Sequence, residues 1–234
     1  MLVAHRGFRS PKGENCMRDF KNALKTCKAV EFDIRLTKDK RIIIFHDHNF
    51  KRIANVDKTV RHFTYDEIKQ IPFFKTNPDW LPPLFIEDFV EKIAKEYEMI
   101  NVEIKPDRYT KSERQILLDA LNKLRESTKA EIIVSSFGLN DLKFIATLDR
   151  NKFKRGYLVE GLSKINYDLI KEFDYLHPYV GTLKLKSSYP IINKINLPLN
   201  IWTFKKDEDV VILKKIYRPE LLHAFISDNP NLKI

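Results

Sequence analysis

The sequence predicts an α/β protein of the (β/α)₈ TIM-type barrel class, with residues 1–234 forming a single domain. Short apolar runs rich in β-branched residues alternate with longer stretches of helical periodicity, which is typical of parallel strands joined by crossover helices. The length of 234 residues suits one such barrel. Several polar side chains directly follow apolar runs, so we expect a site at the C-terminal ends of the strands.

Nine apolar runs are expected to be strands, all of them parallel. They are Leu2–Ala4, Ala29–Ile34, Arg41–Phe45, Met99–Ile104, Glu131–Val134, Gly156–Val159, Tyr175–His177, Leu199–Trp202 and Ala224–Ile226. Between them, apolar stripes at helical spacing run over 17–27, 89–97 and 116–124. Asn15 stands where the N-cap of the first helix is expected.

Two segments depart from a regular barrel. Residues 47–88 are too long for an ordinary connection and are rich in aromatic residues and prolines, which predicts an insertion covering one side of the site. The few residues after Asp228 leave no room for a full eighth helix.

The composition is that of a globular protein, with 43% hydrophobic and 32% charged residues. The net charge of +10 favours anionic ligands, but the lysines are scattered singly, which favours solvated helix faces over a nucleic-acid site. No run is apolar enough to span a membrane. Cys16 and Cys27 match no metal-binding spacing, so we expect free thiols and a cytoplasmic protein.

Three carboxylates are expected at the barrel mouth. Glu31 and Asp33 alternate with apolar residues, so one strand points both acids to the same side, and Glu103 repeats the pattern in a later strand. Carboxylate oxygens suit Mg²⁺ or Ca²⁺ better than zinc. The alternative is that each acid pairs with a nearby cation such as Arg6 or Lys105.

Two histidines also end apolar runs, His5 after the first and His46 after the third. A pair of imidazoles can act as base and acid near neutral pH. A lone histidine at a strand end is more often a hydrogen-bonded structural residue, and His62, His177 and His223 are interpreted in that way.

In this order and spacing, the motifs HRG at 5–7, EN at 14–15, EFD at 31–33, LTKD at 36–39, FHD at 45–47 and VEIK at 102–105 resemble the glycerophosphodiester phosphodiesterase family. The resemblance continues more loosely through SSF at 135–137, IWTF at 201–204 and ISDNP at 226–230. It implies a TIM-type barrel that hydrolyses glycerophosphodiesters to glycerol 3-phosphate and an alcohol. The nucleophile is either the 2-hydroxyl of the substrate's own glycerol or a water molecule.

The resemblance also implies a role for each matching residue. Glu31, Asp33 and Glu103 would hold one divalent cation, Mg²⁺ or Ca²⁺, and His5 and His46 would perform acid–base catalysis. Residues expected to contact the substrate or complete the polar surroundings are Arg6, Lys105, Glu14, Asn15 and Trp202. For Trp202, core packing remains an alternative.

Two other functions stay open. A related barrel phosphodiesterase acting on lysophospholipids or sphingolipids would use similar histidines and acids. A non-catalytic anion-binding protein is the alternative of a different class. The small-molecule diester is the expected partner, and the sequence indicates neither the alcohol head group nor the oligomeric state.

Overall fold

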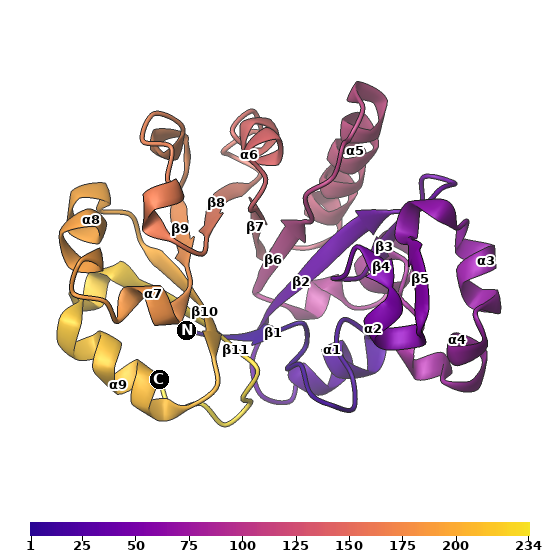
Figure 1. The fold of residues 1–234 in the computed structure, drawn as a ribbon, viewed down its shortest axis with the longest axis horizontal. Coiled ribbons are helices and arrows are strands. Elements are labelled where there is room, and N and C mark those ends of the chain that lie inside the picture. The colour runs from indigo at the N-terminus through magenta and orange to yellow at the C-terminus, as the bar shows by residue number, and fades with distance from the viewer.

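The computed structural model describes all 234 residues, and eight parallel strands close into a barrel (Figure 1). The barrel strands, in the order in which they pair, are β1 (Leu2–His5), β11 (Leu222–Ser227), β10 (Leu199–Phe204), β9 (Tyr175–Pro178), β8 (Lys154–Val159), β7 (Glu131–Ser136), β6 (Met99–Ile104) and β2 (Ala29–Leu36). The ring closes at β1, which pairs with both β11 and β2. The predicted (β/α)₈ barrel class is therefore confirmed.

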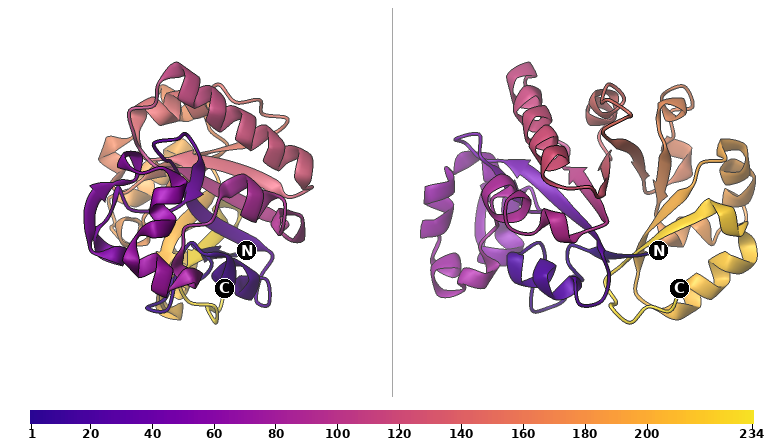
Figure 2. Two further views of the ribbon diagram at one scale, coloured as in Figure 1. Left: turned by 90° about the vertical axis from the view of Figure 1, so that its right-hand side faces the viewer. Right: turned by 180° about the vertical axis from the view of Figure 1, so that it is seen from behind.

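Helices cover the outside of the barrel, as both views in Figure 2 show. The main ones are α1 (Met17–Ala23), α5 (Lys111–Ser127), α6 (Leu139–Ile145), α7 (Val180–Leu183), α8 (Ser188–Ile195) and α9 (Asp207–Ile216). Several connections hold only short turns: a π-helix at Phe85–Val90 and 3₁₀-helices at Ala94–Glu96, Leu162–Lys164, Leu169–Glu172 and Pro219–Leu221. After β11 the chain makes one turn and ends, as the sequence predicted.

The alternation along β2 separates a polar interior from an apolar exterior. Phe32 packs under the helices against Phe20 and Phe89, with ring centroids 5.6 and 4.5 Å apart, within the largest core cluster. Glu31 and Asp33, on the opposite face, are also buried. Because side chains alternate across a strand, packing the aromatic face outward fixes both carboxylates inside the barrel.

The expected strand Arg41–Phe45 is not a barrel strand, so the prediction that all nine runs are parallel is wrong. It forms β3 (Ile42–Ile44), which pairs antiparallel with β2. Only five residues separate the two strands, and the Thr37 amide donates to the Arg41 carbonyl at 2.9 Å. A parallel pairing needs a crossover of a dozen residues or more, so this hairpin permits only the antiparallel arrangement.

The expected insertion forms a lobe on the flank of the barrel, at the right of Figure 1. It contains β4 (Asn49–Phe50), α2 (Lys51–Ala54), β5 (Val56–Thr59), α3 (Tyr65–Gln70), α4 (Pro72–Thr76) and 3₁₀-helices at Val60–His62 and Pro78–Trp80. Its separate apolar core is centred on Phe50, which contacts Phe45, Phe63 and Phe74.

The first helix begins one residue later than predicted. Cys16 is the N-cap of α1, while Asn15 adopts a left-handed backbone with φ 56° and turns its amide toward Asp33. Asparagine tolerates this conformation better than most residues, and the same small polar side chain is typical of N-caps. Asn15, which the sequence indicated as a helix cap, therefore makes a hydrogen bond inside the barrel instead.

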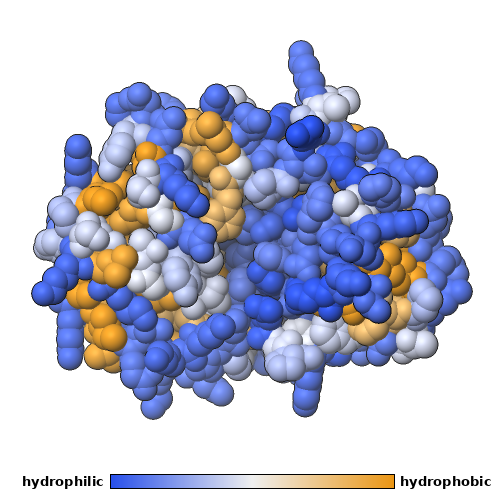
Figure 3. Space-filling view, in the orientation of Figure 1, coloured by the Kyte–Doolittle hydropathy of each residue, from blue (hydrophilic) through white to orange (hydrophobic).

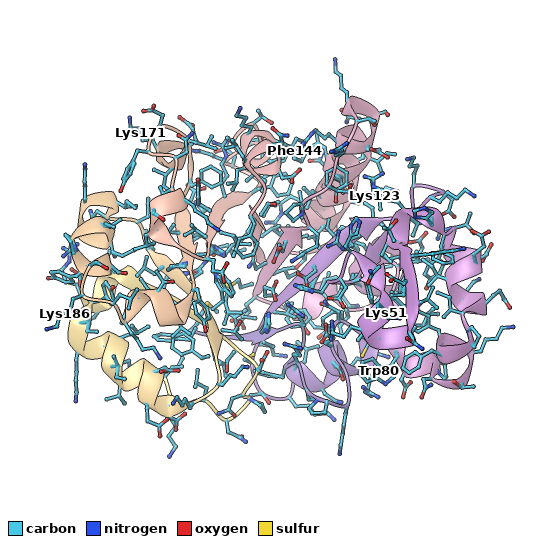
Figure 4. The ribbon with its side chains drawn as sticks, viewed as in Figure 1. Lys51, Trp80, Lys123, Phe144, Lys171 and Lys186 are labelled. Atoms are coloured by element: carbon cyan, nitrogen blue, oxygen red, sulfur yellow. The ribbon has the colours of Figure 1, made fainter.

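Much of the excess positive charge is spread over the outside of the molecule. The labelled lysines of Figure 4, Lys51, Lys123, Lys171 and Lys186, come from four separate segments and are all exposed. Both cysteines are free thiols. None of the helices combines the length and apolarity that crossing a bilayer requires.

Candidate active site

A cavity of about 380 Å³ lies at the C-terminal ends of the barrel strands. Seven of the ten residues singled out from the sequence line it: His5, Arg6, Glu31, His46, Glu103, Lys105 and Trp202. The other three do not line it. Glu14 contacts Arg6, Asp33 contacts Lys105, and Asn15 contacts Asp33. The barrel thus gathers side chains that are up to 197 positions apart in the sequence around one space.

The three predicted carboxylates converge. Asp33 on β2 is in register with Glu103 on β6, and one oxygen from each of Glu31, Asp33 and Glu103 lies within 4.8 Å of the others. All three side chains are buried. Burial raises the pKa of Glu31 well above its usual range, and the neighbouring acids Asp33 and Glu103 add to this rise.

Two cations share the space with these acids. Lys105 Nζ lies 2.6 Å from Glu103 Oε1 and 3.3 Å from Asp33 Oδ1, and Arg6 Nε lies 3.2 Å from Asp33 Oδ2. Burial would raise the pKa of Asp33, but Lys105 and Arg6 hold it well below its usual range. Burial raises the pKa of Glu103 despite its contact with Lys105. The sequence left two alternatives, that the three carboxylates converge or that each pairs with a nearby cation. In the structure the carboxylates converge, and Asp33 and Glu103 also pair with cations.

The acidic cluster still lacks partners for some of its oxygens. Asp33 Oδ1 and Glu103 Oε1 are buried and make no hydrogen bond of acceptable geometry, even though Lys105 approaches both as an ion. Three buried carboxylates within 4.8 Å of one another also repel each other when they are ionised. Hard, buried and under-coordinated oxygens are suited to a divalent cation such as Mg²⁺ or Ca²⁺.

His5 is held by a carboxylate from the other end of the chain. Its Nδ1 lies 2.5 Å from Asp228 Oδ1, and its Nε2 lies 3.9 Å from Glu31 Oε2. Burial lowers the pKa of His5, an effect that the hydrogen bond to Asp228 partly offsets. With Nδ1 donating to Asp228, Nε2 is left free to exchange a proton.

His46 has an equivalent partner in Asp47, whose Oδ1 lies 2.7 Å from His46 Nδ1. Burial would raise the pKa of Asp47, but hydrogen bonds from His46 and Arg52 hold it well below its usual range. Arg52, from α2 of the insertion, also donates to both oxygens of Glu14. The insertion therefore supports the site through Arg52, although none of its residues 47–88 lines the cavity.

Glu14 and Asn15 contact other site residues. Glu14 accepts from Arg6 at 3.0 Å and from Arg9 at 2.8 Å, and Asn15 Nδ2 donates to Asp33 Oδ2 at 2.8 Å. Glu14 thus orients Arg6 at the cavity, and Asn15 orients a carboxylate of the acidic cluster. Glu14 therefore acts on the cavity through Arg6, and Asn15 acts through Asp33, which contacts Arg6 and Lys105 beside the cavity.

The turn after β1 holds an unusual backbone. Arg6, Gly7 and Phe8 all have positive φ, of 50°, 76° and 66°. A Cβ at Gly7 would lie within about 3.1 Å of Asp19 and Phe20, so only glycine fits against α1. Positive φ is uncommon for residues other than glycine, such as Arg6 and Phe8, and it recurs at functional sites. The tight turn directs the Arg6 side chain back over the acids.

The side of the cavity away from the acids is partly aromatic. Trp202 lies between Phe137 and Tyr179, with both ring-centroid distances 5.3 Å, and its indole N–H donates to the His177 carbonyl. Trp202 thus lines the cavity while one face packs on the barrel core. Its position is therefore compatible with substrate contact and with core packing, the two alternatives considered for this residue.

Sequence reasoning assigned no role to several residues that line the cavity or contact its histidines. Asp228 and Asp47 were recognised only as parts of motifs, and their contacts with the histidines depend on barrel closure and on a local turn. Residues for which the sequence offered no signal are Asn101, Leu158, Tyr179, Lys184, Lys205, Lys206 and Asp209. Lys184 pairs with Asp209 at 2.7 Å, whereas Lys205 and Lys206 have no acidic partner.

The other histidines expected to be structural lie outside this cavity. His177 is fully buried and accepts a hydrogen bond from Asn200 at 3.0 Å, and His223 stacks on Tyr175. His62 contacts the Thr59 hydroxyl in the insertion.

Comparisons with known proteins give the family and the fold that this chain resembles. The sequence model of the glycerophosphoryl diester phosphodiesterase family matches residues 5–232. The chain is 27% identical to a glycerophosphodiester phosphodiesterase of Caldanaerobacter subterraneus subsp. tengcongensis, over 100% of this chain and 96% of that protein. It is 32% identical to an uncharacterized protein of Mycoplasma genitalium, over 87% of this chain and 86% of that protein.

Solved structures show the same fold. The crystal structure of a glycerophosphodiester phosphodiesterase from Thermotoga maritima superposes with a TM-score of 0.72 at 24% identity, covering 98% of this chain and 94% of that one. A phosphodiesterase from Oleispira antarctica, solved in complex with sn-glycerol-3-phosphate, gives a TM-score of 0.79 at 21% identity and covers 98% and 93%.

Proposed function

Because the chain belongs to the glycerophosphoryl diester phosphodiesterase family, we propose that it cleaves its substrates with one divalent cation and two acid–base histidines. The enzyme class follows from the family match and the relatives: the chain is a glycerophosphodiester phosphodiesterase acting on small-molecule glycerophosphodiesters. The observation that carries the mechanistic proposal is the convergence of three buried carboxylates and two carboxylate-bound histidines at one cavity.

Glu31, Asp33 and Glu103 would hold the cation, Mg²⁺ or Ca²⁺. The proposal is supported by their oxygen donors, by the unpartnered oxygens of Asp33 and Glu103, and by the closeness of the three carboxylates. When bound, such a cation offsets charge on the phosphate and polarises a coordinated hydroxyl or water.

Arg6 and Lys105 would bind the phosphate oxygens. Both side chains are buried at the cavity, and their contacts with Glu14, Asp33 and Glu103 hold their charges in place before a substrate arrives. Charged donors fixed in a space of low polarity stabilise an anion more strongly than the same donors in water do. Trp202 would pack against the glycerol carbons.

His5 and His46 would exchange protons during the reaction. One imidazole takes the proton of the attacking hydroxyl, and the other donates a proton to the oxygen of the departing alcohol. Asp228 and Asp47 orient the two rings through Nδ1, which leaves each Nε2 for the exchange. The attacking hydroxyl belongs to the substrate's glycerol C2 or to water; transient formation of a cyclic glycerol phosphate would identify the first route.

The test measures release of glycerol 3-phosphate from glycerophosphocholine and glycerophosphoethanolamine with Mg²⁺, with Ca²⁺ and with EDTA. We expect EDTA to abolish turnover, and His46→Ala to lower kcat by about 10²–10⁴-fold with cation affinity unchanged. Glu103→Gln should weaken cation binding, measured by calorimetry, by at least about tenfold. Asp168→Asn, at a carboxylate that is 98% exposed, is the control for loss of an acid.

Each part of the proposal can fail separately. Full activity in EDTA would remove the cation from the mechanism, and wild-type kcat in His46→Ala would remove the histidine. Release of choline phosphate in place of glycerol 3-phosphate would show a different cleaved bond. We also propose a cytoplasmic location, which the two free thiols support.

A further inference from the structure

The wall of the cavity that faces the acidic cluster is rich in lysine. In the ring of eight strands β10 lies four steps from β6 and β9 lies four steps from β2, so β9 and β10 stand across the barrel from the strands that carry the three carboxylates. The connections that follow β9 and β10 bring Lys184, Lys205, Lys206 and Asp209 to the cavity. Figure 3 shows a hydrophilic centre on this face, between the segments that Figure 1 labels β9 and β2.

Two of the three lysines on this wall are free to bind a ligand. Lys184 Nζ lies 2.7 Å from Asp209 Oδ1, so its charge is offset. Lys205 and Lys206 are exposed and form no salt bridge. The reacting phosphate has its own donors in Arg6 and Lys105, which contact the acids on the other side of the cavity. The wall therefore offers positive charge that the proposed reaction does not use.

Backbone contacts hold these two lysines at the cavity. Lys205 and Lys206 are the only residues between β10 and α9. Directly before them, the Phe204 carbonyl accepts a hydrogen bond from the Asp228 amide at 3.1 Å. The side chain of Asp228 holds His5, so one turn of the chain places both the histidine and the lysine pair. The pair does not depend on an acidic partner for its position.

We propose that Lys205 and Lys206 form a second anion-binding subsite, which takes a further phosphate group of the diester whose reacting phosphate lies at Arg6 and Lys105. The inference rests on the function proposed above and specifies the preferred substrates. A phosphate monoester suits the subsite because it carries nearly two negative charges and three acceptor oxygens, enough for two ammonium groups. The further phosphate stands either on the departing alcohol or on the free primary hydroxyl of the glycerol, and the experiment separates these two sources.

The experiment compares three diesters at one fixed concentration of free Mg²⁺. The parent is glycerophosphoethylene glycol; one derivative carries a phosphate on the ethylene glycol hydroxyl, and the other carries it on the primary hydroxyl of the glycerol. Phosphorus NMR follows the conversion of the diester into a monoester and gives kcat and KM for each compound. We expect one derivative to have a KM about 2–30-fold below that of the parent, because two exposed ion pairs each raise affinity by about 1.4–5-fold.

Two further features of the kinetics are expected. The kcat should stay nearly constant among the three diesters, because the second phosphate contributes binding without contacting the reacting atoms. The difference in KM should shrink at about 1 M salt, where the Debye length is about 3 Å.

The variant Lys205→Gln/Lys206→Gln should raise the KM of the preferred derivative to that of the parent and leave the kinetics of the parent unchanged. The matched control is Lys214→Gln/Lys215→Gln, which removes the same charge from an adjacent, exposed pair in α9 that does not line the cavity. Lys205→Arg/Lys206→Arg keeps both charges and should keep the preference. Circular dichroism checks that all three variants fold.

Three results would overturn the inference or its premise. Turnover of all three diesters with equal KM removes the second subsite and leaves the proposed function intact. A preference that survives in Lys205→Gln/Lys206→Gln, or that the control pair abolishes equally, shows that these lysines do not hold the further phosphate. No turnover of any of the three diesters overturns the proposed function itself.

Discussion

Replacing Asp228 by asparagine tests whether the carboxylate that holds His5 contributes to proton transfer. The substitution keeps the size of the side chain and an oxygen that can accept from His5 Nδ1, now 2.5 Å from Asp228 Oδ1, but removes the negative charge. Asp228 would then stop stabilising the positive imidazole that forms when His5 takes up a proton. In this role Asp228 is a positioning residue that acts through its contact with His5.

The magnitude follows from the loss of charge. A hydrogen bond to a charged group stabilises by about 1.5–3 kcal/mol and a neutral one by about 0.5–1.5 kcal/mol, so the difference is on the order of 1–2 kcal/mol. Since 1.36 kcal/mol corresponds to tenfold in rate, we expect kcat to fall by about 5–30-fold with little change in KM. Asp228→Ala, which also leaves Nδ1–H without an acceptor, should lower kcat further.

The assay is steady-state turnover of glycerophosphocholine, with thermal unfolding measured in parallel. Asp209→Asn is the control, because Asp209 lines the same cavity but contacts Lys184 and no histidine. Wild-type kcat in Asp228→Asn, or an equal loss in Asp209→Asn, would show that the contact with His5 has no part in the reaction.

Two further predictions concern stability. Burial lowers the pKa of His177 to about 3, so the unfolded chain takes up a proton below about pH 6.5 that the folded chain does not. The contribution of His177 to the free energy of unfolding is complete above that pH and should fall by about 1.4 kcal/mol per pH unit as the pH drops toward 3. Urea unfolding at pH 7 and at pH 4.5 measures this fall. In His177→Gln we expect the free energy of unfolding to decrease less between the two pH values. Phe50→Ala removes a fully buried ring from the core of the insertion and should destabilise by about 3–5 kcal/mol. A change below about 1 kcal/mol in chemical denaturation would show that this core is not packed as described.

The barrel class could be predicted because strand and helix periods alternate so regularly, and β2 carried the strongest signal. The antiparallel β3 could not be separated from a barrel strand by composition, because Ile42–Ile44 is as apolar as any buried parallel strand. The six residues between the expected runs Ala29–Ile34 and Arg41–Phe45 were the signal available, since a crossover cannot be made in that length. The interior of the lobe over 47–88 was beyond reach because its elements are short and depend on tertiary packing.

At the site, the sequence predicted the residues that end apolar runs. Glu31, Asp33 and Glu103 were found in this way because side-chain alternation is a local property of a strand. The partners of these residues were harder to find. That Asp228 meets His5 depends on which strands become neighbours, and that Lys205 and Lys206 face the cavity depends on how the loop after β10 turns.

The hydrogen bond between His5 and Asp228 joins residues 223 positions apart. It forms only when β1, the first of the barrel strands in the sequence, pairs with β11, the last of them. A ribosome-bound chain that still lacks β11 can carry the acidic cluster and both histidines, yet His5 has no carboxylate to orient it. Catalytic competence would then arise only after β11 has joined the barrel, so the activity of a nascent or truncated chain would report whether the ring of strands has closed.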